Sequence, residues 1–281
     1  MILFPTAKIN LGLRVLGKRP DGYHELTTVM MPVGWCDVLE IVPSRSGVTE
    51  LHTHGRAVDC PPEKNLVMKA YRALADDLGP LPAVEIHLEK IIPDGAGLGG
   101  GSADAAFTLR GLNELLGLGL SDAHLRRVAA RVGADCPFFA TDGAALCTGT
   151  GTTIAEELQL DMSAYTLVIA KPEGVSVSTA EAYAGVHLSP GAADPTEALR
   201  LDISQWRQAL VNDFETSVFA RHPEIAAVKE HMYACGAAYA SMSGSGAAVY
   251  GIFESQRLAR VAFDTLDGCD KWISGGEQTV G

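Results

Sequence analysis

Residues 93–106, PDGAGLGGGSADAA, place five glycines within seven positions and then continue into an alanine-rich stretch. Alternating apolar residues over 84–92 predict a strand before this segment, and the apolar pattern over 102–117 predicts a helix after it. Each glycine held in ordered structure costs about 0.5–1 kcal/mol relative to alanine, so this concentration needs a physical reason. A glycine arch that enters a helix points several N–H groups and the positive end of the helix dipole at one anion. The segment therefore predicts a phosphate-binding loop, with a tight turn without ligand as the alternative.

Three familiar nucleotide-binding motifs do not account for this loop. Gly95 to Gly100 fit G-x-G-x-x-G, but Pro93 and Asp94 separate them from the strand over 84–92, and no acidic residue closes a second strand about 20 positions on, as a dinucleotide site requires. A Walker A loop needs a lysine directly before Ser102, where this chain has Gly101. The protein-kinase motifs H-R-D and D-F-G are absent from the sequence.

Length and composition limit the class of protein. The chain has 281 residues, of which 47% are hydrophobic and 20% charged, which indicates a globular protein with one large domain or two moderate ones. The net charge of −12 disfavours a nucleic acid or an anionic membrane as a partner. No apolar run is long enough to cross a membrane, and the N-terminus lacks the features of a secretory signal. Six cysteines without metal-ligand spacing favour reduced thiols in a cytoplasmic protein.

The order of predicted elements mixes strands and helices without regular alternation, which favours the α+β class. Strands are expected at 7–15, 37–42, 84–92, 143–148, 165–170, on either side of the glycine turn within 237–253, and at 271–274. Helices are expected at 63–78, 102–117, from Ser121 to Gly133, from the capping pair Ser178 and Glu181, from Asp194-Pro195, and at 222–235 and 255–267. Residues 17–24 are expected to form a loop. The sequence TGTGTT at 148–153 favours a boundary between domains at 1–152 and 153–281.

Two side chains are candidates for chemistry. Asp135 follows Gly133 and precedes Cys136-Pro137, so it is expected on a fixed turn, where it could serve as an acid or base or could bond its own backbone. Lys8 falls on the polar face of the strand over 7–15, where a solvated lysine at the edge of a sheet is the alternative. The residues by themselves leave both questions open.

Together these segments resemble the GHMP kinases. PDGAGLGGGSADAA resembles their phosphate loop, and SMSGSGAAVYGIF (241–253) resembles their C-terminal glycine motif. AKINLGLRVLGKRPDGYHEL (7–26), GADCPFF (133–139) and KPEGVSVSTAEAY (171–183) resemble one branch, the 4-diphosphocytidyl-2-C-methyl-D-erythritol kinases. The resemblance implies an α+β fold of two GHMP kinase domains with the active site in the cleft between them.

The resemblance also implies a reaction. ATP with Mg²⁺ would phosphorylate the 2-hydroxyl of 4-diphosphocytidyl-2-C-methyl-D-erythritol, in the non-mevalonate route to isoprenoid precursors. The alternatives are another small-molecule GHMP kinase, for homoserine or a mevalonate derivative, and a non-catalytic or NAD-type nucleotide-binding protein. We expect a monomer or weak homodimer with a small-molecule substrate and with neither nucleic acid nor membrane as a partner.

Residue roles follow from the same resemblance. Asp135 would be the catalytic acid or base and Lys8 its cationic partner. The acceptor would be bound by Asn10, Tyr23, His24, Thr179 and Tyr183, with Tyr23 on one face of the cytosine and Tyr183 on the other. ATP would be bound by Asn65, Lys90, Pro93, Asp94, Gly95, Ala96, Gly97, Leu98, Gly99, Gly100, Gly101, Ser102 and Ala103. A helix N-cap explains Ser102 equally well, a solvated strand end explains Lys90 nearly as well, and Asp104 and Glu114 are expected to be solvated. The metal ligands are not predicted.

Overall fold

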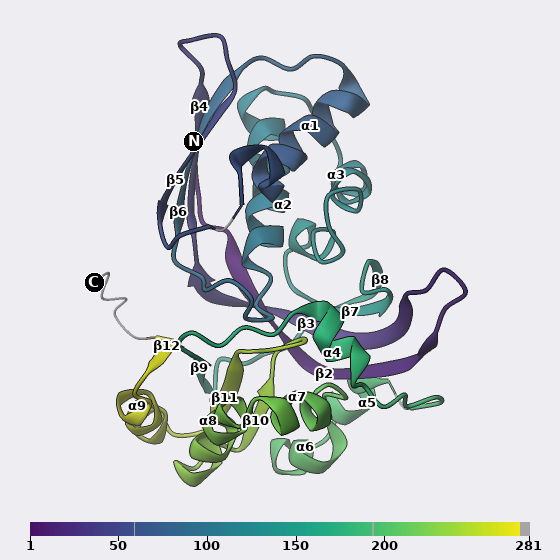
Figure 1. Cartoon of the computed structure of the whole chain (residues 1–281), viewed down its shortest axis with the longest axis vertical. Helices are drawn as coiled ribbons and strands as arrows, with labels where there is room; N and C mark the ends of the chain where they lie inside the picture. Colours follow the sequence, from purple (N-terminus) through teal and green to yellow (C-terminus); the bar gives the residue numbers. More distant parts are fainter. Residues whose placement is uncertain (59, 193, 276–281) are drawn as a thin grey trace. The chain divides into compact units, whose positions relative to one another are not determined.

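The computed structural model describes residues 1–58, 60–192 and 194–275 (Figure 1). The chain divides into two compact units, which we describe separately. The first comprises Met1–Lys8, Pro32–Asp94 and Gly99–Glu157, and the second comprises Ile9–Met31, Gly95–Leu98 and the chain from Leu158 onward. The division therefore passes through the first long strand and through the glycine loop. The boundary expected after residue 152 stays a prediction.

The first unit is built on a four-stranded sheet in the order β1-β4-β6-β5. These strands are β1 (Ile2–Leu3), β4 (Val38–Pro43), β5 (Glu50–Gly55) and β6 (Val84–Lys90). β4 is antiparallel to both of its neighbours, whereas β5 runs parallel to β6 because a 3-10 turn, η1 (Pro62–Lys64), and the helix α1 (Leu66–Leu78) connect them. Figure 1 shows α1, α2 (Gly100–Leu115) and α3 (Asp122–Ala129) gathered on one side of this sheet. Their apolar stripes and the sheet share one core, which includes Leu39, Leu74, Ile86, Leu109 and Leu125.

The second unit contains a fully antiparallel sheet in the order β10-β11-β9-β12. These strands are β9 (Thr166–Pro172), β10 (Tyr239–Met242), β11 (Val249–Phe253) and β12 (Cys269–Ile273). The helices of this unit are α4 (Thr179–Ala184), α5 (Pro195–Leu199), α6 (Ile203–Ala209), α7 (Glu215–Arg221), α8 (Pro223–Ala234) and α9 (Gln256–Thr265). Side chains of α8 and α9 pack with the sheet into a second core that includes Val168, Met232, Val249, Phe253 and Ala262.

A third sheet has the order β2-β3-β7-β8. Its strands are β2 (Thr6–Lys18), β3 (His24–Cys36), β7 (Ala144–Gly149) and β8 (Thr153–Leu158). β2 is buried without interruption from Ala7 to Leu13. The alternation of apolar and polar residues in this strand therefore does not mark a solvent-facing side, and the alternative of a solvated Lys8 at the edge of a sheet is wrong. Its polar residues Lys8 and Asn10 are buried, at 3% and 1% exposure.

The structure extends or shortens several predicted elements. Residues 17–24 form a shorter loop than expected, because β2 continues to Lys18 and β3 starts at His24, with Arg19 N–H donating to the Tyr23 carbonyl across the turn. Strand β3 was not predicted, because most of it is buried as a continuous run and its sequence lacks the alternation that identifies a strand. Helix α3 ends at Ala129, before the expected stop at Gly133.

Three predicted helix starts are confirmed by their caps. The side chains of Ser121, Ser178 and Asp194 each accept a hydrogen bond from a backbone N–H in the first turn of α3, α4 and α5. The Glu181 N–H donates to Ser178 Oγ at 3.1 Å, and the pKa of the Glu181 carboxyl is lowered by a hydrogen bond with His222, 2.9 Å away, and by one with the Ser178 backbone, the reciprocal contact of a capping box. The α+β class is confirmed. In the described part of the chain, no helix combines the length and the apolarity needed to span a bilayer.

Candidate active site

The first unit brings Lys8 and Asp135 together. The Lys8 ammonium nitrogen lies 3.5 Å from Asp135 Oδ2. Asp135 lies on the turn before the 3-10 helix η2 (Phe138–Ala140), and its carbonyl accepts the Phe138 N–H at 3.2 Å, which fixes the direction of the turn. The Lys8 side chain is 4% exposed and that of Asp135 is 30% exposed. An accessible carboxylate beside a buried cation can accept a proton from a hydroxyl group while the cation offsets negative charge on the hydroxyl oxygen.

The start of α2 lies against this pair. The residue before the helix, Gly99, has a φ of 72° and provides no side chain to cap the helix. A Cβ at Gly99 would lie 2.9 Å from the Phe139 ring and 3.2 Å from Lys8 Cγ, so the backbone passes close to both side chains. Ser102 is the third residue of the helix, and its interpretation as the N-cap is wrong. The first turn of α2 therefore directs its N–H groups outward from a helix end that has no side-chain cap.

Cys136, next to Asp135, is not a candidate nucleophile. Burial raises the pKa of its thiol to about 12, and a hydrogen bond with Ser102 only partly opposes this rise. A thiol in this state is neutral at physiological pH and unreactive. The chemistry of this part of the chain therefore rests on the carboxylate and the ammonium group.

Within the second unit, the segment Gly95–Leu98 is held by the glycine turn after β10. The Gly95 and Ala96 carbonyls accept hydrogen bonds from Ala247 and Ala248 N–H groups at 3.1 and 3.0 Å, and the Gly97 carbonyl accepts one from Ser243 Oγ at 2.9 Å. The C=O and N–H of a trans peptide unit point in opposite directions. The N–H groups that follow these three carbonyls therefore point away from the turn. Such a row of aligned N–H groups is a typical binding site for an anion.

Asn10 is fixed by contacts within the second unit. Its Nδ2 donates to Thr28 Oγ1 at 3.0 Å, its Oδ1 lies 3.5 Å from Ser243 Oγ, and its backbone carbonyl accepts the Tyr250 hydroxyl at 2.8 Å. The same Ser243 hydroxyl donates to the glycine loop. The Asn10 side chain and the loop segment are therefore held by one common residue.

The residues expected to bind cytosine lie in the second unit. The His24 and Tyr183 rings stack with their centroids 4.6 Å apart and their planes at 20°, and Tyr183 packs edge-on against Phe214. This spacing is that of two rings in direct contact and leaves no room for a third ring between them. Tyr23 is 66% exposed at the turn before β3, and Thr179 is exposed at the first position of α4.

Two of the residues expected on the nucleotide side have structural contacts in the first unit. Asn65 is buried and caps α1 by accepting the Val67 N–H at 2.9 Å. Lys90 is 3% exposed and lies between two carboxylates, so the alternative of a solvated lysine at the strand end is wrong. Pro93 is buried, whereas Asp94 is exposed. Direct contact of any of these residues with ATP stays a prediction.

Two buried acids that the sequence did not predict, Asp37 and Asp104, hold Lys90. The expectation that Asp104 is solvated is wrong, because it is 2% exposed; Glu114 is exposed, as expected. Asp104 interrupts a helix that is otherwise rich in small apolar residues, which is a signal of a buried acid. Asp37 leaves no such signal, since its role depends on the pairing of β4 with β6, and pairing cannot be read from one strand.

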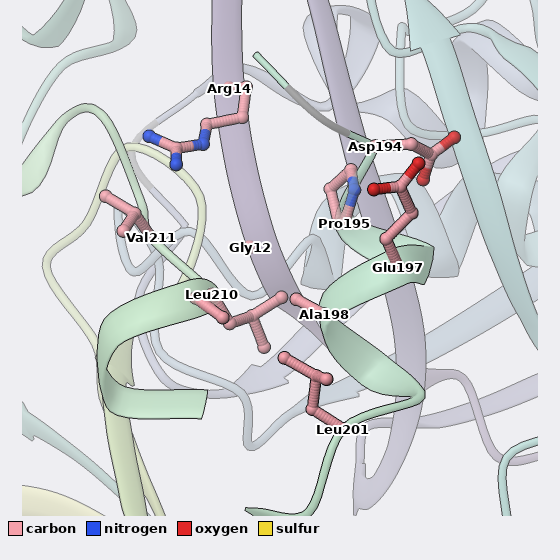
Figure 2. A pocket seen from close by; sticks show the side chains of 10 residues that line it. Gly12, Arg14, Asp194, Pro195, Glu197, Ala198, Leu201, Leu210 and Val211 are labelled. Atoms are coloured by element: carbon pink, nitrogen blue, oxygen red, sulfur yellow. The ribbon is translucent and has the colours of Figure 1, made fainter. Parts of the chain in front are cut away.

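A surface pocket with a volume of about 290 Å³ lies in the second unit (Figure 2). Its apolar wall consists of Pro195, Ala198, Leu201, Leu210 and Val211. Arg14 lies on one side and the carboxylates of Asp194 and Glu197 on the other. Arg14 is already paired with Asp213 at 3.0 Å. None of the residues predicted to bind ATP or the acceptor lines this pocket, so it is not the predicted active site.

Comparison with known proteins shows similarity to one family of kinases. A family model described as "GHMP kinases N terminal domain" matches residues 65–143, and one described as "GHMP kinases C terminal" matches residues 196–267. A protein of Parabacteroides distasonis named 4-diphosphocytidyl-2-C-methyl-D-erythritol kinase is 49% identical over 90% of this chain and 92% of its own length. A protein of Porphyromonas gingivalis with the same name is 42% identical over 98% of this chain and 99% of its own length.

Solved structures agree with these relatives. A crystal structure of 4-(cytidine 5'-diphospho)-2C-methyl-D-erythritol kinase has a TM-score of 0.81 and 33% identity, covering 97% of this chain and 98% of its own. Mevalonate kinase from Methanococcus jannaschii has a TM-score of 0.71 at 14% identity, covering 97% of this chain and 96% of its own, and at this identity it shows a shared fold alone.

Proposed function

Because the chain belongs to the GHMP kinases and, within them, to the family of 4-diphosphocytidyl-2-C-methyl-D-erythritol kinases, we propose that it transfers the γ-phosphoryl group of ATP to the 2-hydroxyl of that alcohol. The observation that carries the proposal is the Lys8–Asp135 pair beside the uncapped start of α2. The reaction is a step of the non-mevalonate route to isoprenoid precursors. Kinases of homoserine or mevalonate are not favoured, because structures with those names share only 13–20% identity with this chain.

Asp135 and Lys8 have different roles toward the hydroxyl group of the acceptor. In the transfer, the acceptor oxygen forms a bond to the γ-phosphorus, the bond from that phosphorus to the bridging oxygen of ADP breaks, and the hydroxyl proton passes to an Asp135 carboxylate oxygen. Lys8 lies where its charge offsets the negative charge on the acceptor oxygen. In a loose transition state the proton leaves late, so Asp135 also orients the hydroxyl group in line with the phosphorus.

The glycine loop is proposed to bind the triphosphate. Its N–H groups after Gly95, Ala96 and Gly97 point away from the turn that holds them, and the first turn of α2 adds further N–H groups and the helix dipole. Binding through backbone N–H groups needs no basic surface, which agrees with the net charge of −12. The residues of this proposed site are Pro93 to Ala103, with Asn65 and Lys90 beside them.

We infer that the nucleotide is used as its Mg²⁺ complex. Mg²⁺ usually takes most of its ligands from phosphates and water, and needs one or two protein oxygens at most. Within residues 1–58, 60–192 and 194–275, no group of three His, Cys, Asp or Glu side chains is placed to hold a metal ion by itself. Because the phosphates supply most of its ligands, we treat the ion as a part of the substrate, where it would neutralise charge on the phosphates.

The direct test of this function is ADP release with a panel of acceptor alcohols. We expect turnover with the CDP-linked methylerythritol and none with homoserine or mevalonate. Turnover with either of the latter two but not with the CDP compound would refute the assignment to this family branch. Nucleotide binding without ADP release for any acceptor would instead indicate a non-catalytic protein. The expected monomer or weak homodimer and the cytoplasmic location remain predictions.

Substitution of Tyr23 by alanine is expected to raise the KM for the acceptor and to leave the KM for ATP unchanged. Stacking of a base on an aromatic ring is worth about 1–3 kcal/mol, which corresponds to a rise of about 5- to 150-fold. His24 and Tyr183 already stack on each other, so the exposed Tyr23 ring is the one able to take the base. Phe4→Ala, at an aromatic residue that is 58% exposed in the first unit, is the control. Equal effects of both substitutions would contradict the role of Tyr23.

Substitution of Lys8 by alanine is expected to lower kcat by about 10²- to 10³-fold while changing the KM for ATP little, because its charge acts on the acceptor oxygen in the transition state. Lys8→Met retains the apolar stem that passes Gly99 and is expected to lose the same activity. Lys69→Ala, on the exposed side of α1, is the control. A variant whose only change is a higher KM for ATP would show that Lys8 serves the nucleotide instead.

A further inference from the structure

Three ionisable side chains meet in the interior of the first unit, and we call Asp37, Lys90 and Asp104 the ion triad. The Lys90 ammonium group lies 2.5 Å from Asp37 Oδ2 and 2.8 Å from Asp104 Oδ2. The three side chains are 0–3% exposed. A buried group of charges carries a large desolvation penalty, and apolar residues of similar volume often give equal or greater stability. Stability of the core is therefore a weak explanation for these residues.

The ion triad joins the two ends of the glycine loop. Lys90 is the last residue of β6, directly before the loop, and Asp104 lies in the second turn of α2, directly after it. Asp37 Oδ1 also accepts the N–H groups of Ile91 and Ile92 at 2.6 and 2.8 Å, which fixes the chain as it enters the loop. A Cβ on Gly100, at the start of α2, would lie 3.3 Å from the Lys90 nitrogen. The entry of the loop, its exit and the preceding strand are thus tied to one ammonium group.

We propose that Lys90 is a positioning residue, which acts on ATP by holding the two ends of the phosphate-binding loop through Asp37 and Asp104 and does not itself touch the nucleotide. This inference rests on the proposed function, because it explains what holds the glycine loop in the shape that binds the triphosphate. The contacts of Lys90 support it, because both carboxylates lie within hydrogen-bond distance of its ammonium group and its side chain is almost fully buried.

The charge of the ion triad adds a second consequence. Asp104 Oδ1 is buried without a hydrogen-bond partner, which is costly for an ionised oxygen. Burial raises the pKa of Asp104 to about 8; the Lys90 charge opposes the rise and the Asp37 charge adds to it. Below this pKa, Asp104 is neutral and the ion triad has no net charge. Above it, the ion triad carries one negative charge beneath the helix start that receives the phosphates, so ATP binding is expected to weaken as the pH rises.

The first experiment separates positioning from direct contact. We expect Lys90→Met to raise the KM for ATP by about 10- to 100-fold, the effect of a small misplacement of binding groups. It should leave the ratio of kcat/KM for ATP to that for GTP unchanged. A changed ratio would overturn the proposal, since it would mean that Lys90 contacts the base. The control is Lys69→Met, at an exposed lysine of α1.

The second experiment uses Asp104→Asn, which keeps the shape of the side chain and its hydrogen bond from Lys90. The KM of the wild type for ATP is expected to rise between about pH 7 and pH 9, and that of the variant to stay flat. The same rise in both proteins would overturn the proposal. This experiment does not use the Lys90→Met protein, so it still tests the proposal if that variant fails to fold. The panel of acceptor alcohols is measured on the same samples and reports whether phosphoryl transfer occurs at all. It therefore distinguishes a wrong role for Lys90 from a wrong proposed function.

A double-mutant cycle completes the test. If Lys90 acts through Asp104, Lys90→Met combined with Asp104→Asn should raise the KM for ATP by much less than the product of the two single effects at the higher pH. If Lys90 contacts ATP independently of the ion triad, the effects should multiply, and the proposal fails.

Discussion

Replacement of Asp135 by asparagine is expected to lower kcat by about 10²- to 10⁴-fold, the usual contribution of a general acid or base. The amide keeps the shape of the side chain on its turn but cannot accept the hydroxyl proton as a carboxylate does. It also removes the negative partner of Lys8, which lies 3.5 Å away. Because Asp135 is partly exposed and fixed by backbone contacts, the fold should be preserved. The measurement is single-turnover ADP release, with thermal unfolding to check the fold.

Asp142→Asn is the matched control for this substitution. Asp142 lies nearby in the chain and its side chain is 89% exposed, with an ion pair to Arg110 at the surface. We expect this variant to retain normal kcat. If Asp135→Asn retained full turnover, the mechanism would be wrong. A loss confined to the KM of the acceptor would show that Asp135 binds the hydroxyl group without assisting its proton transfer.

Replacement of Gly97 by alanine is expected to remove both stability and activity. Gly97 has a φ of 71°, and alanine in this left-handed conformation costs about 1–3 kcal/mol. A Cβ at this position would also lie 2.0 Å from the Ser243 carbonyl oxygen, a backbone atom that cannot rotate away. The overlap adds about 1–3 kcal/mol or more, and it pushes the loop off the turn that orients its N–H groups. We expect a lower free energy of unfolding in urea and a fall in kcat/KM for ATP.

Gly119→Ala separates the cost of the left-handed backbone conformation from the cost of the overlap with Ser243. Gly119 also has a positive φ, of 66°, but a Cβ there would meet no atom within 4 Å. This control should show the backbone cost alone, with normal kinetics. If Gly97→Ala were no more destabilised than Gly119→Ala and bound ATP normally, the close seating of the loop on Ser243 would have no part in phosphate binding.

The elements that sequence reasoning predicted share a local origin. The glycine loop, the caps at Ser121 and Ser178 and the strand before the loop are all determined by neighbours within a few positions. The ion triad could not be predicted, because it needs the register of β4 against β6 and the direction of α2 at the same time. The stacking of His24 on Tyr183 likewise joins residues from distant segments. The alternation in β2 marked its polar residues but suggested a solvent-facing side for them, since alternation alone cannot show that both faces of a strand are covered.

The division of the chain into two units limits how the protein can be separated into fragments that fold. The second unit includes Ile9–Met31 and Gly95–Leu98, both drawn from the N-terminal half of the sequence. Within that unit, Leu13 exchanges backbone hydrogen bonds with Val211 and Asp213, and the Tyr250 hydroxyl bonds to Asn10. A fragment beginning at residue 153 would lose all of these partners and leave buried polar groups unpaired. No single cut can therefore yield two independently folding halves, and a split or domain-swapped version of this enzyme would have to exchange the β2–β3 hairpin along with the C-terminal segment.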